Sequence, residues 1–189
     1  MSKLLLVIDM QNDFIDGALG TKEAVAIVPY VKEVIQNFNG KVLFTRDTHF
    51  ENYMDTQEGR NLPVPHCIKG TPGHDLYGRL ADFEDVVTPN AVILEKETFG
   101  SDKLCRTLEE AFSGEPDVIE FCGVVTNICV ISNIVLCQTY FKKAKLSLHL
   151  DACAALGDMQ HHAVEVIKGL DVLVNILNGN AGLGLLCKG

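Results

Sequence analysis

Six short runs of consecutive apolar residues, rich in Val, Ile and Leu, recur along this chain. Runs that are apolar at every position, rather than at alternate positions, are typical of strands buried on both faces of a sheet. Between the runs lie segments whose apolar residues recur at helical spacing. The pattern predicts strands at Leu4–Ile8, Lys41–Thr45, Ala91–Leu94, Val118–Val125, Leu146–Leu150 and Val172–Leu177, and helices at Ala24–Phe38, Asp102–Phe112, Ile128–Lys142 and Asp158–Gly169.

The alternation of predicted strands and helices indicates the fold class. A repeated β–α order is typical of α/β proteins, in which a mostly parallel sheet carries helices on both faces and the crossovers are right-handed. The chain has 189 residues, which is close to the size of one domain. We therefore expect a single domain over residues 1–189.

One long segment, from Arg46 to Asn90, interrupts the strand–helix rhythm. It holds four of the six prolines and many His, Asp and Glu residues, with a weak helical pattern only at His74–Leu80. Long loops inside compact domains are commonly functional. We expect this segment to contribute to a site, and we leave the tail at Asn178–Gly189 unassigned.

Charge and cysteine content exclude several classes of protein. The net charge of -9 repels phosphate backbones and anionic membranes, so no nucleic-acid or membrane partner is expected. No apolar run reaches the ~20 residues of a membrane span or resembles the ~7–15-residue core of a signal peptide. Seven cysteines are an odd number, and they show no Cys-x-x-Cys spacing. A reducing compartment is therefore favoured, and we expect a cytoplasmic protein.

Candidate chemical groups follow the predicted strands. In an open parallel sheet, ligands bind beyond the carboxyl ends of the strands, so the residues at those ends are the first candidates for a site. An acid, a cluster of metal-binding residue types, a base and a thiol occupy these positions. They are Asp9, the segment Arg46–His49, Glu95 with Lys96, and the segment Gly123–Cys129.

Cys129 is a candidate nucleophile. Thr126 or Asn127 could cap the helix that begins at about this point, which would place the thiol in a first helical turn. The helix dipole and the ammonium of Lys96 would then lower the pKa of the thiol. Asp9 could take the thiol proton and later deliver it to a leaving amine. Position alone leaves open whether Cys129 is a nucleophile or a buried packing residue, which is the role expected for the other six cysteines.

A metal site is a second candidate. Asp47 and His49 stand on alternate residues at a strand end, and His66 follows in the long loop. A carboxylate with two imidazoles suits Zn, Fe or Mn. Spacing alone leaves open that these are solvated loop residues, because two distant segments must be brought together.

Three segments resemble a known family. Ile8–Phe14, with the sequence IDMQNDF, Glu95–Phe99 and Gly123–Val130 resemble, in this order, the three signature regions of the isochorismatase-like cysteine hydrolases, which include the nicotinamidases. The resemblance extends from Leu4 to about Leu177. It implies a Rossmann-like fold with a parallel sheet of about six strands.

The resemblance also implies catalytic roles. Asp9, Lys96 and Cys129 match the Asp-Lys-Cys triad of the family. A cis peptide bond is implied between Val124 and Val125, with the backbone N–H groups of Val125 and Cys129 forming an oxyanion hole. Turnover would pass through a thioester on the cysteine.

The implied metal centre of the nicotinamidase branch includes a fourth ligand. Asp47, His49 and His66 match its ligands, and the fourth is a His or an acid. Glu58 and Asp55 are the acidic candidates, and we prefer Glu58 because its longer side chain reaches further from a loop. The resemblance implies a divalent ion, with Zn preferred and Fe or Mn as alternatives.

The substrate implied is nicotinamide or a similar small amide, with the ring nitrogen on the metal and a role in pyridine nucleotide salvage. Phe14 would line the substrate pocket. Nicotinamidases commonly place a second aromatic residue, often Trp, against the ring; this chain has no Trp, so Tyr53 or Phe99 are the alternatives. A homo-oligomer is also implied.

Two other functions stay open. One is an isochorismatase-type or carbamoyl-type hydrolase of the same fold. The other is a non-catalytic α/β module that binds metal or senses oxidation. The remaining histidines carry no predicted role, since one lies in an apolar run and three on expected surface helices: His149, His74, His161 and His162.

Overall fold

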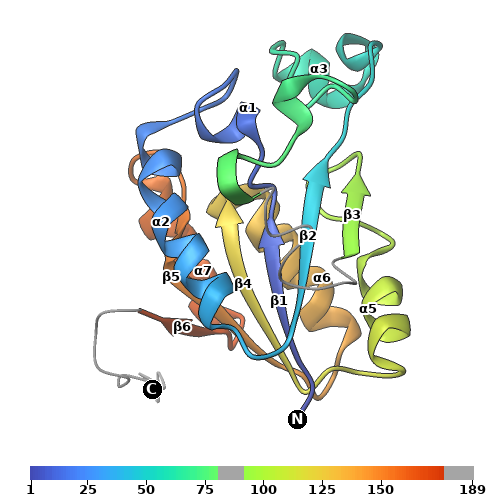
Figure 1. Ribbon diagram of the computed structural model, residues 1–189, viewed down its shortest axis with the longest axis vertical. Coiled ribbons are helices and arrows are strands. Elements are labelled where there is room, and N and C mark those ends of the chain that lie inside the picture. The colour runs from blue at the N-terminus through green and yellow to red at the C-terminus, as the bar shows by residue number, and fades with distance from the viewer. Residues whose placement is uncertain (81–91, 177–189) are drawn as a thin grey trace.

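A computed structural model describes residues 1–80 and 92–176 of the chain (Figure 1). Its strands form one parallel sheet in the order β3-β2-β1-β4-β5-β6. This confirms the predicted α/β class with six strands. The strands are β1 (Lys3–Ile8), β2 (Lys41–Asp47), β3 (Val92–Lys96), β4 (Val118–Val124), β5 (Lys145–Ala154) and β6 (Leu173–Asn175).

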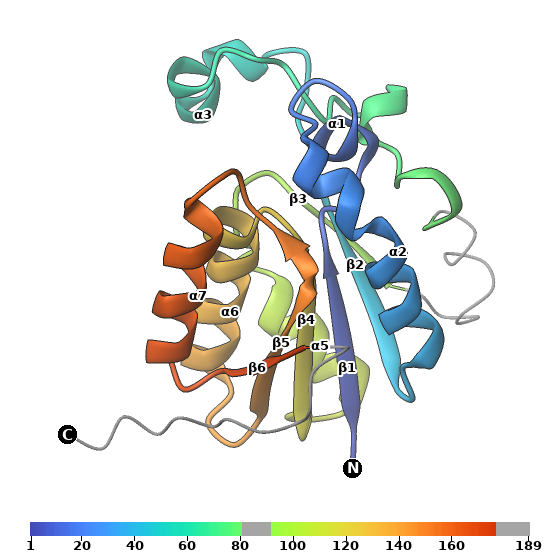
Figure 2. The ribbon, with the colours of Figure 1, turned by 90° about the vertical axis from the view of Figure 1, so that its left-hand side faces the viewer.

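Helices cover both faces of this sheet (Figure 2). On one face lies α2 (Lys22–Asn37), and on the other lie α5 (Leu104–Phe112), α6 (Ile131–Tyr140) and α7 (Met159–Gly169). The central strand β1 is apolar from Leu4 to Ile8, and these residues are buried because both faces of the strand are covered. The three layers are those expected from the sequence.

Element boundaries differ from the predictions where side chains or pairing decide them. The helix α2 begins at Lys22, before the predicted Ala24, because the Thr21 side chain caps it by accepting the Ala24 N–H at 3.0 Å. The strand β5 continues past the predicted end at Leu150, because its pairing with β4 resumes after a register shift.

The segment after β2 is irregular but well packed. It contains α3 (Gln57–Asn61) and short 3₁₀ turns at Tyr53–Asp55, Pro72–His74 and Gly78–Leu80. The helix expected over His74–Leu80 is therefore wrong, because Asp75 is extended and separates two of these turns. Several predicted features lie outside the described residues. They are the end of the long loop, the predicted strand ends Ala91 and Leu177, and the tail with Cys187.

The strand order reverses beside β1, which pairs with β2 on one edge and with β4 on the other. Loops that leave such a point in opposite directions open a crevice at the carboxyl ends of the strands. Above this edge, α1 (Asn12–Ile15) and α3 lie away from the main helical layers (Figure 1). Among the described helices, none combines the length and apolar character needed to cross a membrane.

Candidate active site and metal centre

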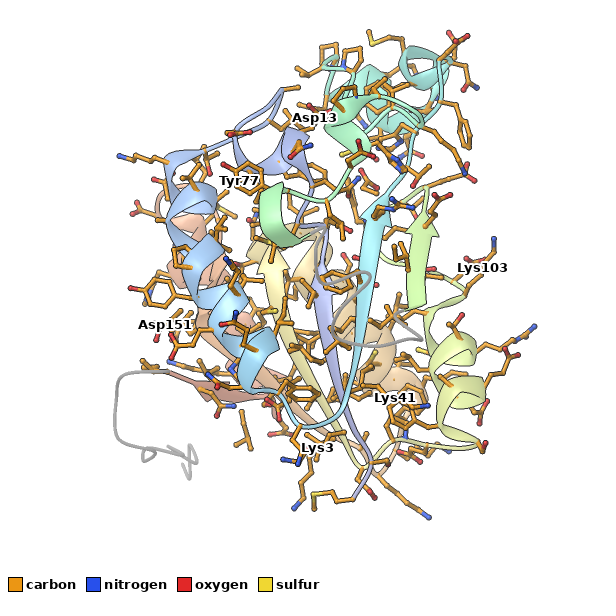
Figure 3. The ribbon with its side chains drawn as sticks, viewed as in Figure 1. Lys3, Asp13, Lys41, Tyr77, Lys103 and Asp151 are labelled. Carbon is orange, nitrogen blue, oxygen red and sulfur yellow. The ribbon has the colours of Figure 1, made fainter. Side chains whose placement is uncertain are left out.

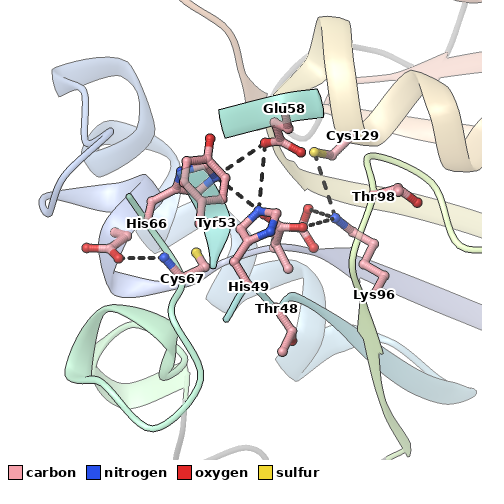
Figure 4. A network of polar contacts seen from close by, with 12 residues as sticks. Thr48, His49, Tyr53, Glu58, His66, Cys67, Lys96, Thr98 and Cys129 are labelled. Carbon is pink, nitrogen blue, oxygen red and sulfur yellow. Dashed lines mark hydrogen bonds and ion pairs between the residues drawn. The ribbon is translucent and has the colours of Figure 1, made fainter. Parts of the chain in front are cut away.

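The proposed triad residues come together at the carboxyl ends of three strands. Asp9 follows β1, Lys96 ends β3, and Cys129 lies in the turn after β4. The Nζ atom of Lys96 is 2.7 Å from Oδ2 of Asp9 and 3.9 Å from Sγ of Cys129 (Figure 4). All three side chains are buried. An acid, an ammonium and a thiol therefore share one desolvated site.

The turn that carries Cys129 differs from the predicted capped helix. Residues Thr126–Val130 form a π turn, and α6 begins only at Ile131. The predicted cap by Thr126 or Asn127 is wrong, because Val125 occupies the cap position and no side chain caps the turn. The peptide bond between Val124 and Val125 is cis, at the position that the family resemblance implies.

Four side chains of metal-binding residue types converge beside the proposed triad: Asp47, His49, Glu58 and His66, with one ligand atom from each lying within 4.8 Å of the others. The carboxylate oxygens Asp47 Oδ2 and Glu58 Oε1 lie 2.9–3.7 Å from the two Nε2 atoms. Ligands about 2.1 Å from a tetrahedral ion stand roughly 3.4 Å apart, so these separations fit a metal. The Nε2 atom of His49 is buried without a hydrogen-bond partner in the described part of the chain, as expected for a ligand. The residues present can therefore hold a divalent ion.

Contacts behind the ligands fix their orientation. The amide of Gln11 accepts the Asp47 N–H at 2.7 Å and donates to the Asp47 carbonyl at 2.8 Å. The Nδ1 atom of His66 is 2.8 Å from the Val64 carbonyl, which leaves Nε2 facing the carboxylates. Asp13 lies on α1 at the same end of the molecule (Figure 3). Its carboxylate accepts the N–H of Cys67 at 2.7 Å and so anchors the loop that carries His66. Such outer contacts orient metal ligands.

The comparisons with known proteins agree with this geometry. A model of the isochorismatase domain matches residues 3–174. The chain belongs to the isochorismatase family. An isochorismatase-family protein named PncA of Bacillus subtilis is 36% identical over 173 residues, which cover 85% of this chain and 91% of the relative.

Two solved structures have a fold similar to that of this chain. The nicotinamidase PncA from Bacillus subtilis has a TM-score of 0.78 at 28% identity, covering 92% of this chain and 99% of that one. The pyrazinamidase of Pyrococcus horikoshii, solved in complex with zinc, has a TM-score of 0.77 at 26% identity, covering 93% and 99%. Both confirm the predicted fold class.

The buried charged groups of the site shift one another's pKa values. Burial raises the pKa of Asp9, Lys96 opposes this effect, and the net pKa lies above its usual value. Burial disfavours the ammonium of Lys96, but Asp9, Cys129 and Asp47 raise its pKa above the usual value. Burial also opposes ionisation of Asp47, yet the neighbouring imidazoles of His49 and His66 and the charge of Lys96 lower its pKa. Lys96 therefore stays charged between two carboxyl groups.

The thiol of Cys129 differs from the sequence expectation. Burial raises its pKa well above the ordinary value, and the charge of Lys96 only partly opposes this rise. Lys96 lowers the pKa of the thiol as expected, but the net pKa is raised rather than lowered, because desolvation is the larger effect. A protonated thiol needs a base, and Asp9 is the acid that shares the Lys96 ammonium with it, 2.7 Å from Nζ on one side while Sγ lies 3.9 Å from Nζ on the other.

Three aromatic residues were candidates for the pocket. The Phe14 ring is buried and lies 5.3 Å from the ring of His66. Tyr53 is also buried, with its ring edge-on to those of His49 and His66 at 4.7 and 5.1 Å. Phe99 is largely exposed. Phe14 and Tyr53 thus border the candidate metal ligands, whereas Phe99 does not contact them in any described ring pair.

Asp55, the alternative fourth ligand, is exposed and lies outside the metal-binding group. His161 and His162 are exposed on α7, as predicted. The surface position predicted for His74 is wrong, because it is buried and lies 2.8 Å from the Thr48 hydroxyl.

His149 is half-buried rather than a core residue, because its Nε2 atom pairs with Glu120 at 2.5 Å. The buried polar residues Gln11 and Thr45, which contact Asp47 and Asp9, were assigned no role from the sequence. A polar residue that directly follows an apolar run in a buried strand, as Thr45 follows Val42–Phe44, is the signal that points to such a role.

Proposed function

We propose that this protein is a metal-containing cysteine amidohydrolase that converts nicotinamide, or a similar small amide, to the carboxylic acid and ammonia. One observation carries the proposal: Lys96 contacts both Asp9 and Asp47, and so joins a thiol–acid pair to a metal-binding group. The similarity to proteins named nicotinamidase and pyrazinamidase supports the substrate class.

The residues proposed to hold the metal are Asp47, His49, Glu58 and His66. Zinc is the proposed ion, supported by the zinc complex of the related pyrazinamidase, and iron or manganese would suit the same ligands. When bound, the ion would offer a coordination position to the pyridine nitrogen. Phe14 is proposed to contact the ring of the substrate from beside His66.

The first half-reaction forms a thioester. Asp9 takes the proton from Sγ of Cys129, and the thiolate attacks the amide carbonyl carbon, so that a C–S bond forms. The N–H groups of Val125 and Cys129 are proposed to donate to the oxyanion. Asp9 then returns the proton to the amide nitrogen, the C–N bond breaks, and ammonia leaves.

The second half-reaction releases the acid. Asp9, again a carboxylate, takes a proton from a water molecule as its oxygen attacks the thioester carbonyl. The C–S bond breaks, the carboxylic acid forms, and the proton on Asp9 returns to the sulfur of Cys129. Lys96 stays protonated throughout and compensates the negative charge that moves between Asp9 and the thiolate.

An isochorismatase-type or carbamoyl-type reaction is less favoured, because neither needs the metal-binding group. A non-catalytic module is less favoured because the buried thiol, acid and lysine are in contact. We also propose a cytoplasmic homo-oligomer acting in pyridine nucleotide salvage. The location is supported by the six described cysteines, which are all free and buried.

The test is metal analysis of the purified protein followed by ammonia release from nicotinamide, pyrazinamide and benzamide. We expect stoichiometric metal and faster release from the first two, since benzamide lacks the ring nitrogen. Cys129→Ala should abolish both turnover and the covalent adduct. Metal-free protein, or full activity of the alanine variant, would contradict the proposal.

A further inference from the structure

We propose that Thr45 is a positioning residue that holds Asp9 and determines which of its carboxylate oxygens exchanges the proton with Cys129. The inference rests on the proposed function, because it assigns a part to a residue outside the triad. Thr45 lies in β2 and is fully buried, next to the buried apolar residues Val42–Phe44 of that strand.

Thr45 contacts Asp9 twice. Its Oγ1 atom accepts the backbone N–H of Asp9 at 3.1 Å and donates to Oδ1 of the same residue at 2.6 Å. A hydroxyl has one proton, and an ionised carboxylate only accepts. The direction of both hydrogen bonds is therefore determined, and the hydroxyl proton points at Oδ1.

The backbone of Asp9 needs this support. Its φ angle is +48°, in the left-handed region that is unfavourable for residues other than glycine, although Asp and Asn enter it more readily than most. The turn redirects the chain after β1, and the bond from the Asp9 N–H to Thr45 holds it in place. One side chain thus supports both the backbone and the carboxylate of the proposed base.

The two oxygens of Asp9 are consequently not equivalent. Oδ1 is occupied by the Thr45 hydroxyl, whereas Oδ2 is buried without a directed hydrogen bond from any described residue. Its neighbour is the ammonium of Lys96, 2.7 Å away as an ion pair. Oδ2 therefore faces the ammonium that also lies 3.9 Å from Sγ of Cys129, and we assign the proton exchange to this oxygen, while Oδ1 is held by Thr45.

The test compares Thr45→Val, which removes the hydroxyl and keeps the shape, with Thr45→Ser, which keeps the hydroxyl. Losing a hydrogen bond to a charged group costs roughly ten- to hundredfold. We expect kcat of Thr45→Val to fall by about that factor, with KM and metal content unchanged, and Thr45→Ser to recover most of the loss. If Thr45→Val does not fold, Thr45→Ala provides a second variant without the hydroxyl.

A substrate-independent measurement separates this inference from the proposed function. Alkylation of Cys129 by iodoacetamide, followed by mass spectrometry, should slow in Thr45→Val and in Asp9→Asn but not in Thr45→Ser. If the wild-type protein releases no ammonia from any amide, the proposed function is wrong. The alkylation rates still test the role of Thr45, because they do not depend on turnover. Equal kcat and alkylation rates with and without the hydroxyl, or a serine variant as slow as the valine variant, would overturn the role of Thr45.

Discussion

The Nζ atom of Lys96 lies 3.2 Å from Oδ1 of Asp47, and the other oxygen of that carboxylate faces His49 and His66. Asp47 therefore belongs to the proposed metal group through one oxygen and contacts the proposed triad through the other. A change of charge at either centre should alter the electrostatics of the other, because both carboxyl groups near Lys96 are buried.

Replacing Lys96 by Met should separate the two centres. The substitution removes the charge that compensates Asp9 and Asp47, so we expect kcat/KM for ammonia release to fall on the order of 10³-fold. The four metal-binding side chains remain, so metal content measured by elemental analysis should be retained. Loss of the metal together with activity would show that Lys96 supports the metal group itself.

Glu58 and Asp55 provide a matched pair of acids on the same segment. Glu58→Gln should weaken metal binding at least about tenfold, because it replaces a ligand oxygen of the converging group. Asp55→Asn should bind metal as the wild type does, since Asp55 is exposed outside that group. Titration of the apoprotein with zinc measures both constants. A stronger effect at Asp55 would reverse the assignment.

Gly123 should tolerate no side chain. Its φ angle is +118°, and a Cβ atom would lie 2.1 Å from the carbonyl oxygen of Ile8, next to Asp9. Gly123→Ala should lower the free energy of unfolding by at least about 2 kcal/mol and also lower activity. Gly169→Ala, with nothing within 4 Å of its Cβ, is the control and should change stability by less than about 1 kcal/mol. Denaturant unfolding compares the two variants.

The pair formed by Glu120 and His149 should make stability depend on pH. The hydrogen bond from His149 lowers the pKa of Glu120 below its usual 4.5. A carboxyl group with a lowered pKa in the folded state contributes stability above about pH 4.5, and this contribution is lost as the pH falls through the folded-state pKa.

Glu120→Gln should therefore lower the free energy of unfolding by about 1–2 kcal/mol near pH 7 and have little effect near pH 3. Glu165→Gln, which breaks an exposed pair with Lys168, is the control and should leave stability nearly unchanged, because solvent screens an exposed pair. A pH-independent difference at Glu120 would contradict the expectation.

The sequence by itself determined the layers of this fold and the location of the site. Continuous apolar runs such as Leu4–Ile8 can be buried only between two helical layers, and parallel strands place their carboxyl ends at one edge. The sequence therefore predicts that Asp9, Lys96 and Cys129 lie close together, and the structure places Lys96 in contact with the other two.

Only the tertiary structure decided what depends on packing between distant segments. That Glu58 rather than Asp55 joins the converging side chains depends on how the segment after β2 folds. The raised pKa of Cys129 depends on desolvation, which local spacing does not reveal. The same holds for Thr45, since its partner Asp9 lies 36 positions away, just after the end of the neighbouring strand. Periodicity is a local property, whereas burial and hydrogen-bond geometry arise only when the strands are assembled.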